Sequence, residues 1–405
     1  MKRPRVLLIK PVLPFPPEQG TRVVSFAVIE SLSAEFDVTV LARVLDDAES
    51  RHVQSLRQWC ERVVTVFPAN RRGRVARIVY RAAYVLRSLL TGRSLKSLYD
   101  CPGALVARAR ELAAEAFDLV IVEYWQLYPL LAVFPPERTV LLTHDIDIQV
   151  SGDHARLESR WARVRAFRRR RLEAREERGA YRRARHVWAL TGRDADAVRA
   201  LAGPRTDVSV LPFGLAESAF AKTPGPRGDH EVLFIGAMGA AFNRDAVVHL
   251  ARDIHPALAG IPGLRVTIVG GALPAEVADF ASRPGVTVTG HAPDTGVYLR
   301  RATCLLVPLR YGGGLRIRIL EAMAAGLPVV CSPVAVAGMG LDDAVLLARF
   351  PDEYAAWVGR LSGDPVFREN RSEHARQAVR GRYGPAARGD GIRRLARETG
   401  APGGA

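Results

Sequence analysis

The chain has 405 residues, more than one hydrophobic core usually fills, so its length predicts two domains. Hydrophobic residues make up 48% and charged residues 25% of the sequence, a composition typical of globular proteins. The sequence has no run of eighteen apolar residues, the length that a membrane-spanning helix needs. The net charge of +16 favours anionic partners, which are nucleic acid, an acidic membrane surface or a phosphorylated substrate. A compositional bias toward arginine explains the charge equally well, so charge alone selects no function.

The N-terminus and the cysteines favour a cytoplasmic protein. The basic and apolar start resembles a signal peptide, but Lys10 and Pro11 end the apolar run and no small-residue cleavage site follows. We interpret the run as a buried strand. The four cysteines lack CxxC spacing and lie in apolar stretches, which argues against a zinc site and a disulfide framework.

Short apolar runs alternate with longer amphipathic stretches, the pattern of parallel sheets covered by helices. In the first half this predicts a helix over 22–32 and strands over 6–9, 38–41, 63–67, 119–122, 140–143 and 187–190. In the second half it predicts helices over 244–258, 273–282, 297–302 and 316–325 and strands over 232–235, 266–269, 286–288, 304–308 and 329–332. Each half is therefore expected to be a doubly wound α/β domain.

Domain boundaries follow from composition. The Pro- and Gly-rich segment 221–228 is typical of an exposed connector. We expect an N-terminal Rossmann-like domain over 1–215, a second over 216–384, and a C-terminal helix with a disordered tail over 385–405. Ligands of open parallel sheets bind beyond the carboxyl ends of the strands, so two such domains would face a central cleft.

Two arginine-rich stretches lie in the first half. The segment 71–90 interleaves arginines with apolar residues at helical spacing, which fits either a solvated helix or a helix on a membrane surface. The segment 154–185 contains four consecutive arginines, but also glutamates at distances suited to i,i+4 pairs. Neither has the aromatic interleaving of nucleic-acid platforms, so we expect no nucleic-acid partner.

The segment Tyr311–Ala325 carries the most specific chemistry. Three glycines directly after a strand let the backbone approach a ligand, and the helix that follows directs its free N–H groups at the same place. Arg316 and Arg318 in the first turn oppose the helix dipole unless an anion compensates them. Glu321 lies on the same helix face as Arg318, where a carboxylate can bind ribose hydroxyls. The alternative is a Gly-rich turn with merely exposed arginines.

The stretch from Gly312 to Ala324, GGGLRIRILEAMA, resembles the donor-binding signature of bacterial GT-B glycosyltransferases of glycosyltransferase family 4. The likeness extends to 234–246 and 286–291, to Pro328–Ser332, and to the opening loop from Lys10 to Arg22. It covers nearly the whole chain and is strongest over 230–385. The resemblance implies the GT-B fold, with the acceptor on the first domain and a nucleotide-sugar donor on the second.

The resemblance also implies roles for individual residues. Glu321 would bind the ribose, the backbone of Gly313, Gly314 and Leu315 with Arg316 or Arg318 would hold the diphosphate, and His291 would contact the base through its main chain. His144 and Asp145, at a strand end, would lie near the transferred sugar or the acceptor hydroxyl. The catalytic candidates are thus His144, Asp145, Arg316 and Glu321, and the donor-binding candidates are Gly20, Gly236, Asn243, Arg244, His291, Gly312, Gly313, Gly314, Leu315 and Arg318.

The sequence departs from the family pattern at three positions. Gly313 stands where many members have a glutamate that touches the donor sugar, so the sugar is not predicted. Ala237 and Asn243 stand where many have Arg and Lys, so Arg244, Arg316 or Arg318 would meet the diphosphate charge.

The expected function is transfer of a sugar, with retention, from a nucleoside-diphosphate sugar to an acceptor hydroxyl in surface polysaccharide or glycolipid biosynthesis. No bound cofactor is expected, and no clustered Asp motif indicates a metal. Expected partners are the donor, a lipid-linked glycan acceptor and an anionic membrane surface, with the protein in the cytoplasm or peripheral on the inner face of the cell membrane. The alternatives are a nucleotide-sugar 2-epimerase on the same fold, a basic nucleic-acid-binding protein and an inactive scaffold subunit.

Overall fold

A computed structural model of the 405-residue chain describes residues 3–17, 20–67, 74–221, 230–292 and 294–400. These residues form two compact units: residues up to Phe213 together with those from Gly389 onward make unit 1, and Gly214–Arg388 make unit 2. The predicted connector 221–228 falls, from residue 222, outside the described residues, and so does the end of the tail, 401–405.

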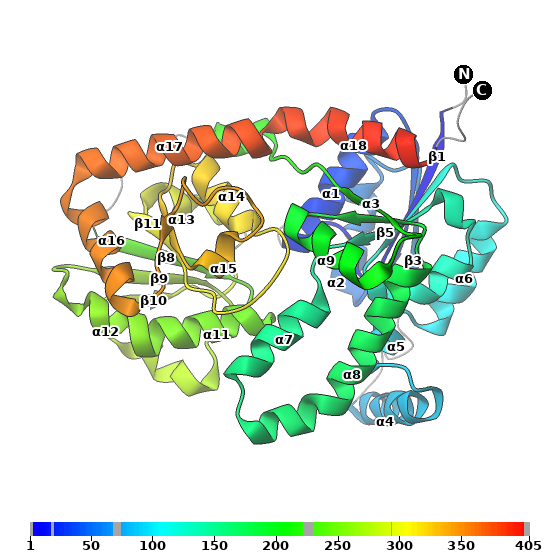
Figure 1. Ribbon diagram of the computed structural model, residues 1–405, viewed down its shortest axis with the longest axis horizontal. Coiled ribbons are helices and arrows are strands. Elements are labelled where there is room, and N and C mark those ends of the chain that lie inside the picture. The colour runs from blue at the N-terminus through cyan, green and yellow to red at the C-terminus, as the bar shows by residue number, and fades with distance from the viewer. Residues whose placement is uncertain (1–2, 18–19, 68–73, 222–229, 293, 401–405) are drawn as a thin grey trace. The chain divides into compact units, whose positions relative to one another are not determined.

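Unit 1 is built on a seven-stranded parallel sheet in the order β3-β2-β1-β4-β5-β6-β7 (Figure 1). Its strands β4 and β5 are buried along their whole length, as expected of a parallel sheet covered on both faces. The strands are β1 Arg5–Lys10, β2 Asp37–Arg43, β3 Arg62–Val66, β4 Leu119–Glu123, β5 Thr139–Thr143, β6 His186–Ala189 and β7 Asp207–Val210.

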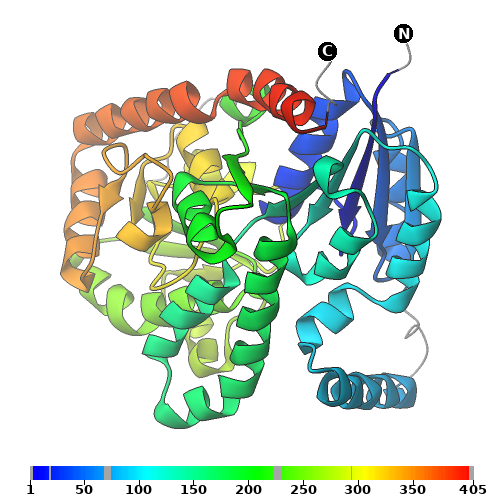
Figure 2. The same cartoon turned by 45° about the vertical axis from the view of Figure 1, so that its right-hand side comes forward.

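Helices surround the sheet of unit 1 (Figure 2). They are α1 Gly20–Ser33, α2 Asp47–Ser50, α3 Val53–Leu56, α4 Arg74–Thr91, α5 Leu95–Asp100, α6 Gly103–Ala113, η1 Trp125–Ala132, η2 Pro136–Arg138, α7 Asp147–Leu157, α8 Arg160–Arg183 and α9 Gly192–Ala202. The C-terminal helix α18, Pro385–Gly400, adds its last turns to this unit: Ile392 is fully buried, and Arg393 and Arg397 both pair with Glu35 of the α1–β2 turn.

Unit 2 has a six-stranded parallel sheet in the order β10-β9-β8-β11-β12-β13. Its strands are β8 Glu231–Gly236, β9 Arg265–Gly270, β10 Val286–Val288, β11 Cys304–Val307, β12 Val329–Cys331 and β13 Leu346–Leu347. Its helices are α10 Glu217–Phe220, α11 Ala241–His249, η3 Leu250–Ile254, α12 His255–Ala257, η4 Leu258–Gly260, η5 Ala275–Ser282, α13 Gly296–Arg301, α14 Ile317–Ala324, α15 Pro333–Val336, α16 Pro351–Gly363 and α17 Pro365–Tyr383.

The structure confirms the two parallel α/β sheets and corrects two predicted elements. The predicted helix 273–282 is a short 3-10 segment with a break at Val277. The arginine-rich stretch 154–185 is not one helix, because the chain turns after Glu158 and Ser159 caps α8 by accepting from the N–H of Ala162. The edge strands β7 and β13 were not predicted. All four cysteines are buried free thiols.

Candidate functional site

Both sheets have a topological switch point, where ligands of doubly wound folds bind beyond the strand carboxyl ends. In unit 2 the switch lies between β8 and β11, and in unit 1 between β1 and β4. The glycine-rich segment follows β11, and the loop with Gly236 follows β8. The sheet order therefore makes neighbours of two loops that the sequence separates by about 70 residues.

The glycine-rich loop has the backbone conformation that glycine permits. Gly312 and Gly314 have φ of 137° and 71°, where a side chain would be strained. The N–H groups of Gly313, Gly314 and Leu315 donate to no atom of the described residues. These donors precede the N-terminus of α14, so the loop can receive an anion.

Arg316 lies just before α14, not inside its first turn. The helix begins at Ile317, and Arg316 has a ψ of 82°, so the predicted helical start at 316 is wrong by one residue. The guanidinium lies 4.6 Å from the centre of the Phe242 ring, and a Cβ on Gly312 would come within 2.1 Å of its Nη2. Absence of a side chain at Gly312 therefore makes room for Arg316 beside the loop.

Arg318 and Glu321 lie together on α14, as the helical spacing predicts. Arg318 Nη1 donates to Glu321 Oε2 at 2.6 Å and approaches Thr295 Oγ1 at 3.3 Å. The two side chains are 30% and 24% exposed, so a ligand can reach both. The opposite side of the helix, with Leu320 and Ala324, is buried.

The loop after β8 packs tightly against α11. A Cβ on Gly236 would meet the Asn243 amide carbon at 2.9 Å, and Asn243 donates to the carbonyl of Ala237. Arg244 donates to the carbonyls of Met238 and Gly239, so part of its guanidinium shapes this loop. If Arg244 binds the diphosphate as predicted, it must do so through its remaining N–H groups.

One ion pair that the sequence did not indicate joins the loop after β11 to helix α11. Arg310, after β11, donates through Nε to Asp245 Oδ2 at 2.9 Å and through Nη2 to Asp245 Oδ1. The bidentate bond to Asp245 raises the pKa of Arg310 further. His291 lies beyond β10 and is exposed, next to Gly290, whose carbonyl accepts from the N–H of Gly270 at 2.9 Å.

The switch point of unit 1 contains a buried ion pair. Lys10, at the end of β1, donates to Glu123 Oε2 at 2.7 Å, and both side chains are 0% exposed. Ser25 of α1 donates to the same oxygen at 2.7 Å and also contacts Lys10. The other oxygen, Glu123 Oε1, is buried and has no hydrogen bond to any residue that the structure describes.

His144 follows β5 and completes this cluster. Its Nε2 lies 3.1 Å from Glu123 Oε2, its ring stacks on Tyr124 at 4.5 Å, and only 3% of it is exposed. Burial would raise the pKa of Glu123, but Lys10 and the His144 bond lower it to about 2. Burial lowers the pKa of His144. A neutral His144 therefore donates from Nε2 to an ionised Glu123.

A pocket of about 230 Å³ opens beside this cluster, beyond β1, β4 and β5. It is lined by Pro11, Val12, Lys96, Asp100, Tyr124, Trp125, Gln126, Asp145 and Asp147. Tyr124 adopts φ 73° and ψ 141°, a region that non-glycine residues rarely occupy and that often marks a binding site. Of the predicted residues in unit 1, Asp145 lines this pocket, whereas the exposed Gly20 begins α1.

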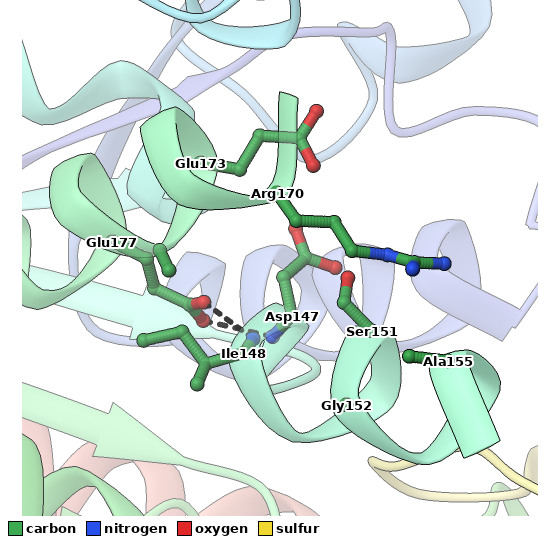
Figure 3. Close-up of a pocket in the computed structure, with 9 residues that line it drawn as sticks. Asp147, Ile148, Ser151, Gly152, Ala155, Arg170, Glu173 and Glu177 are labelled. Carbon is green, nitrogen blue, oxygen red and sulfur yellow. Dashed lines mark hydrogen bonds between the residues drawn. The ribbon is translucent and has the colours of Figure 1, made fainter. Parts of the chain in front are cut away.

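Glu177 holds the start of α7, which carries Asp147 to the pocket. Figure 3 shows its carboxylate reaching from α8 to the N–H groups of Asp147 and Ile148, at 2.8 and 2.7 Å. Tyr181 donates to Glu177 as well, and burial raises the pKa of Glu177 to about 8. The expectation that the glutamates of 154–185 form surface i,i+4 pairs is wrong for Glu176 and Glu177, which are buried structural acceptors.

Comparison with known proteins agrees with this geometry. Residues 229–364 match the family described as Glycosyl transferases group 1. The chain carries a group 1 glycosyltransferase domain. Over residues 229–364 the resemblance to glycosyltransferases seen in the sequence is thereby confirmed, and with it the enzyme class of that domain.

Solved structures of several proteins share the fold along nearly the whole chain. Sucrose-phosphate synthase from Thermosynechococcus elongatus is 18% identical, with a TM-score of 0.69 over 98% of this chain and 99% of that one. HepE of Anabaena in complex with UDP-glucose is 15% identical, with a TM-score of 0.68 over 97% and 99%. WaaG, a glycosyltransferase of lipopolysaccharide biosynthesis, is 17% identical, with a TM-score of 0.61 over 99% and 100%. The predicted GT-B fold is confirmed. No curated protein matches the sequence.

Sequence reasoning named His144 and Asp145 in unit 1 but did not find Lys10, Glu123, Trp125, Gln126 or Asp147 as residues of this site. A signal was present, because Lys10 and Glu123 each follow a run of four apolar residues with a charge at the end of the strand. A charge at the carboxyl end of a buried strand needs a partner, and the neighbouring strand supplies it. Trp125, Gln126 and Asp147 had no comparable signal.

Proposed function

We propose that this glycosyltransferase binds a nucleoside-diphosphate sugar on unit 2 and transfers the sugar, with retention, to an acceptor hydroxyl. The observation that carries the proposal is the loop 312–316. Its N–H groups that donate to no described residue lie beside Arg316 and directly before the N-terminus of α14, one turn from Glu321, where we place the diphosphate. HepE, which shares the fold, has been solved with UDP and with UDP-glucose.

Such a site supplies the chemistry that the reaction requires. Cleavage of the bond between the anomeric carbon and the nucleoside diphosphate places new negative charge on the leaving phosphate. Donors that are already aimed at that position stabilise the transition state more than the ground state. No protein nucleophile is required, and the family resemblance implies that no metal ion is needed.

Replacement of Glu321 by alanine tests the donor site. A carboxylate that accepts from ribose hydroxyls contributes about 1.5–3 kcal/mol, so UDP or GDP affinity is expected to fall roughly 10- to 100-fold. Thermal shift and calorimetric titration with both nucleotides measure the change. Glu276→Ala, an exposed glutamate of the same unit, is the matched control. If wild-type protein binds no nucleotide and cleaves none of a panel of nucleotide sugars, the proposed function is wrong.

The acceptor side of the proposal concerns the membrane. Within the described residues no helix is long and apolar enough to span a bilayer. Two helices of unit 1 nevertheless expose apolar side chains among arginines. On α8 these are Trp161, Val164 and Phe167, with exposed fractions of 79%, 62% and 62%, and on α4 they are Val85, Leu86, Leu89 and Leu90. We call these seven residues the apolar tips.

The apolar tips fit an anionic membrane surface. Both views place α4 and the junction of α7 with α8 at the lower end of unit 1 (Figures 1 and 2). The exposed Arg163, Arg168 and Arg171 lie among the apolar residues of α8, so apolar insertion and charge attraction act together. A peripheral position there would bring the enzyme to a lipid-linked glycan acceptor in surface polysaccharide or glycolipid synthesis. The side chains of 71–81, part of the predicted basic helix, lie outside the described residues.

Vesicle binding tests this surface. We expect the protein to sediment with vesicles containing anionic phosphatidylglycerol, and the binding to weaken as salt rises. Phe167→Ser together with Trp161→Ser is expected to lower the partition coefficient at least tenfold, because it removes two apolar anchors. Phe350→Ser, which changes a 65% exposed phenylalanine of unit 2, is the control. Equal sedimentation of the double variant and wild type would exclude the apolar tips as the contact.

A further inference from the structure

The two arginines at the start of α14 have different surroundings. Arg316 lies beside the glycine-rich loop, with its guanidinium 4.6 Å from the centre of the Phe242 ring. Arg318 donates through Nη1 to Glu321 Oε2 at 2.6 Å and to Thr295 Oγ1 at 3.3 Å. The structure thus places Arg318 at the carboxylate that would bind the ribose, one turn along the helix from the loop.

The ion pair of Arg318 with Glu321 is poorly placed to stabilise α14. The helix begins at Ile317, so Arg318 is a cation in the first turn, where it opposes the helix dipole. An arginine that precedes its glutamate is also the less favourable order of a helical pair. The side chains are 30% and 24% exposed, and such a pair contributes little to stability. Helix stability therefore does not explain why an arginine stands at position 318.

The contact with Arg318 fixes one oxygen of Glu321 and leaves the other for a ligand. Oε2 accepts from Arg318, whereas Oε1 makes no hydrogen bond to any residue that the structure describes. Thr295 lies between β10 and α13, so its bond to Arg318 ties a second element to the same place. A glutamate side chain loses rotational freedom when it binds a ligand, so a side chain that is already held in place binds more tightly.

We propose that Arg318 is a positioning residue of the donor site. It holds Glu321 so that the second carboxylate oxygen accepts from the ribose hydroxyls, and it thereby makes the site select ribonucleotides over 2′-deoxyribonucleotides. The inference rests on the proposed function and deepens it. Arg316 and the loop N–H groups then meet the charge of the diphosphate, and Arg318 acts on the nucleotide through Glu321.

The affinities for the ribose and deoxyribose forms of one nucleotide test the proposal. Calorimetric titration compares UDP with 2′-deoxy-UDP and GDP with 2′-deoxy-GDP. Wild-type protein should prefer the ribose form of the nucleotide that it binds about tenfold, because the deoxy form lacks a donor to Glu321. Arg318→Met keeps an unbranched stem and removes the guanidinium. It should lower the affinity for the ribose form roughly 5- to 10-fold and leave that for the deoxy form within about a factor of two.

Two further variants connect this change to Glu321. Addition of Arg318→Met to Glu321→Ala should lower the affinity no further, because the arginine acts through the carboxylate. Arg283→Met, which removes the arginine of another ion pair of unit 2, with Asp279, is the matched control and should keep the wild-type preference. Additive losses in the double variant would overturn the proposal. Equal losses for the ribose and deoxyribose forms in Arg318→Met would also overturn it, because they would mean that Arg318 contacts the diphosphate or only supports the fold.

Nucleotide binding by the wild-type protein separates this inference from the proposed function. If the protein binds no nucleotide, the proposed function fails and the inference fails with it. If it binds UDP or GDP and cleaves a donor, but either wild type shows no preference for ribose or Arg318→Met retains that preference, only the role of Arg318 is rejected.

Discussion

Replacement of Glu123 by glutamine is expected to destabilise unit 1 by about 3–5 kcal/mol at pH 7. The substitution leaves the ammonium of Lys10 buried with a neutral amide, and the folded state can relieve this only by releasing the proton. Four of the five tryptophans lie in unit 1, at positions 59, 125, 161 and 188, so urea unfolding followed by tryptophan fluorescence reports mainly on this unit.

The pH dependence of this effect follows from the pKa of Glu123. In the folded state that pKa is about 2, below the ordinary value of 4.5. Its stabilisation is therefore complete above about pH 4.5 and is lost as the pH falls toward 2. The free-energy difference between wild type and Glu123→Gln should shrink over that interval.

Two variants control the interpretation. Glu115 also pairs with arginines, Arg5 and Arg62, but is 32% exposed, so Glu115→Gln should cost less than about 1 kcal/mol. The double variant Lys10→Met with Glu123→Leu should recover much of the loss, because no unpaired charge remains. A cost below 1 kcal/mol for Glu123→Gln would show that Lys10 and Glu123 do not form an ionised pair.

The sequence predicts the fold well where its signals are local. Apolar runs mark the central strands because these are buried on both faces, and GGGLRIRILEAMA contains a whole strand-to-helix turn. The edge strand β7, Asp207–Val210, was not predicted because its polar residues face water. Strand β13 was not predicted because it has two residues. The turn at Glu158 and Ser159 lacks the Gly or Pro that usually marks a break.

Beyond His144 and Asp145, which the resemblance indicated, the contacts of the site of unit 1 could not be predicted because they are distant in sequence. Lys10 and Glu123 are 113 residues apart and meet because β1 and β4 are neighbours in the sheet. Glu177 illustrates the same limit. Its spacing on a charged helix indicates a solvated pair, but the fold of α7 against α8 buries it as a cap. The local periodicity of the sequence predicts neither the pairing of Lys10 with Glu123 nor the burial of Glu177.

Replacement of Arg316 by alanine is expected to lower the rate of donor cleavage by about 10²–10³, with a smaller change in donor KM. The guanidinium lies beside the loop where the leaving diphosphate would develop charge, and the loss of one such positioned donor typically has this magnitude. Release of UDP or GDP from the donor identified in the nucleotide-sugar panel, followed by mass spectrometry, measures the rate. Arg349→Ala, an exposed arginine of unit 2, is the control.

Gly312→Ala tests whether the position of Arg316, and not only its charge, matters. The new Cβ would lie 2.1 Å from Arg316 Nη2, so the guanidinium must move, and the φ of 137° strains the loop as well. We expect Gly312→Ala to reduce the cleavage rate nearly as far as Arg316→Ala, and the double variant to be little worse than either, because both act on one group. Additive losses would mean that Gly312 and Arg316 serve the donor independently. If Arg316→Ala cleaves the donor at more than half the wild-type rate, this arginine does not take part in the reaction.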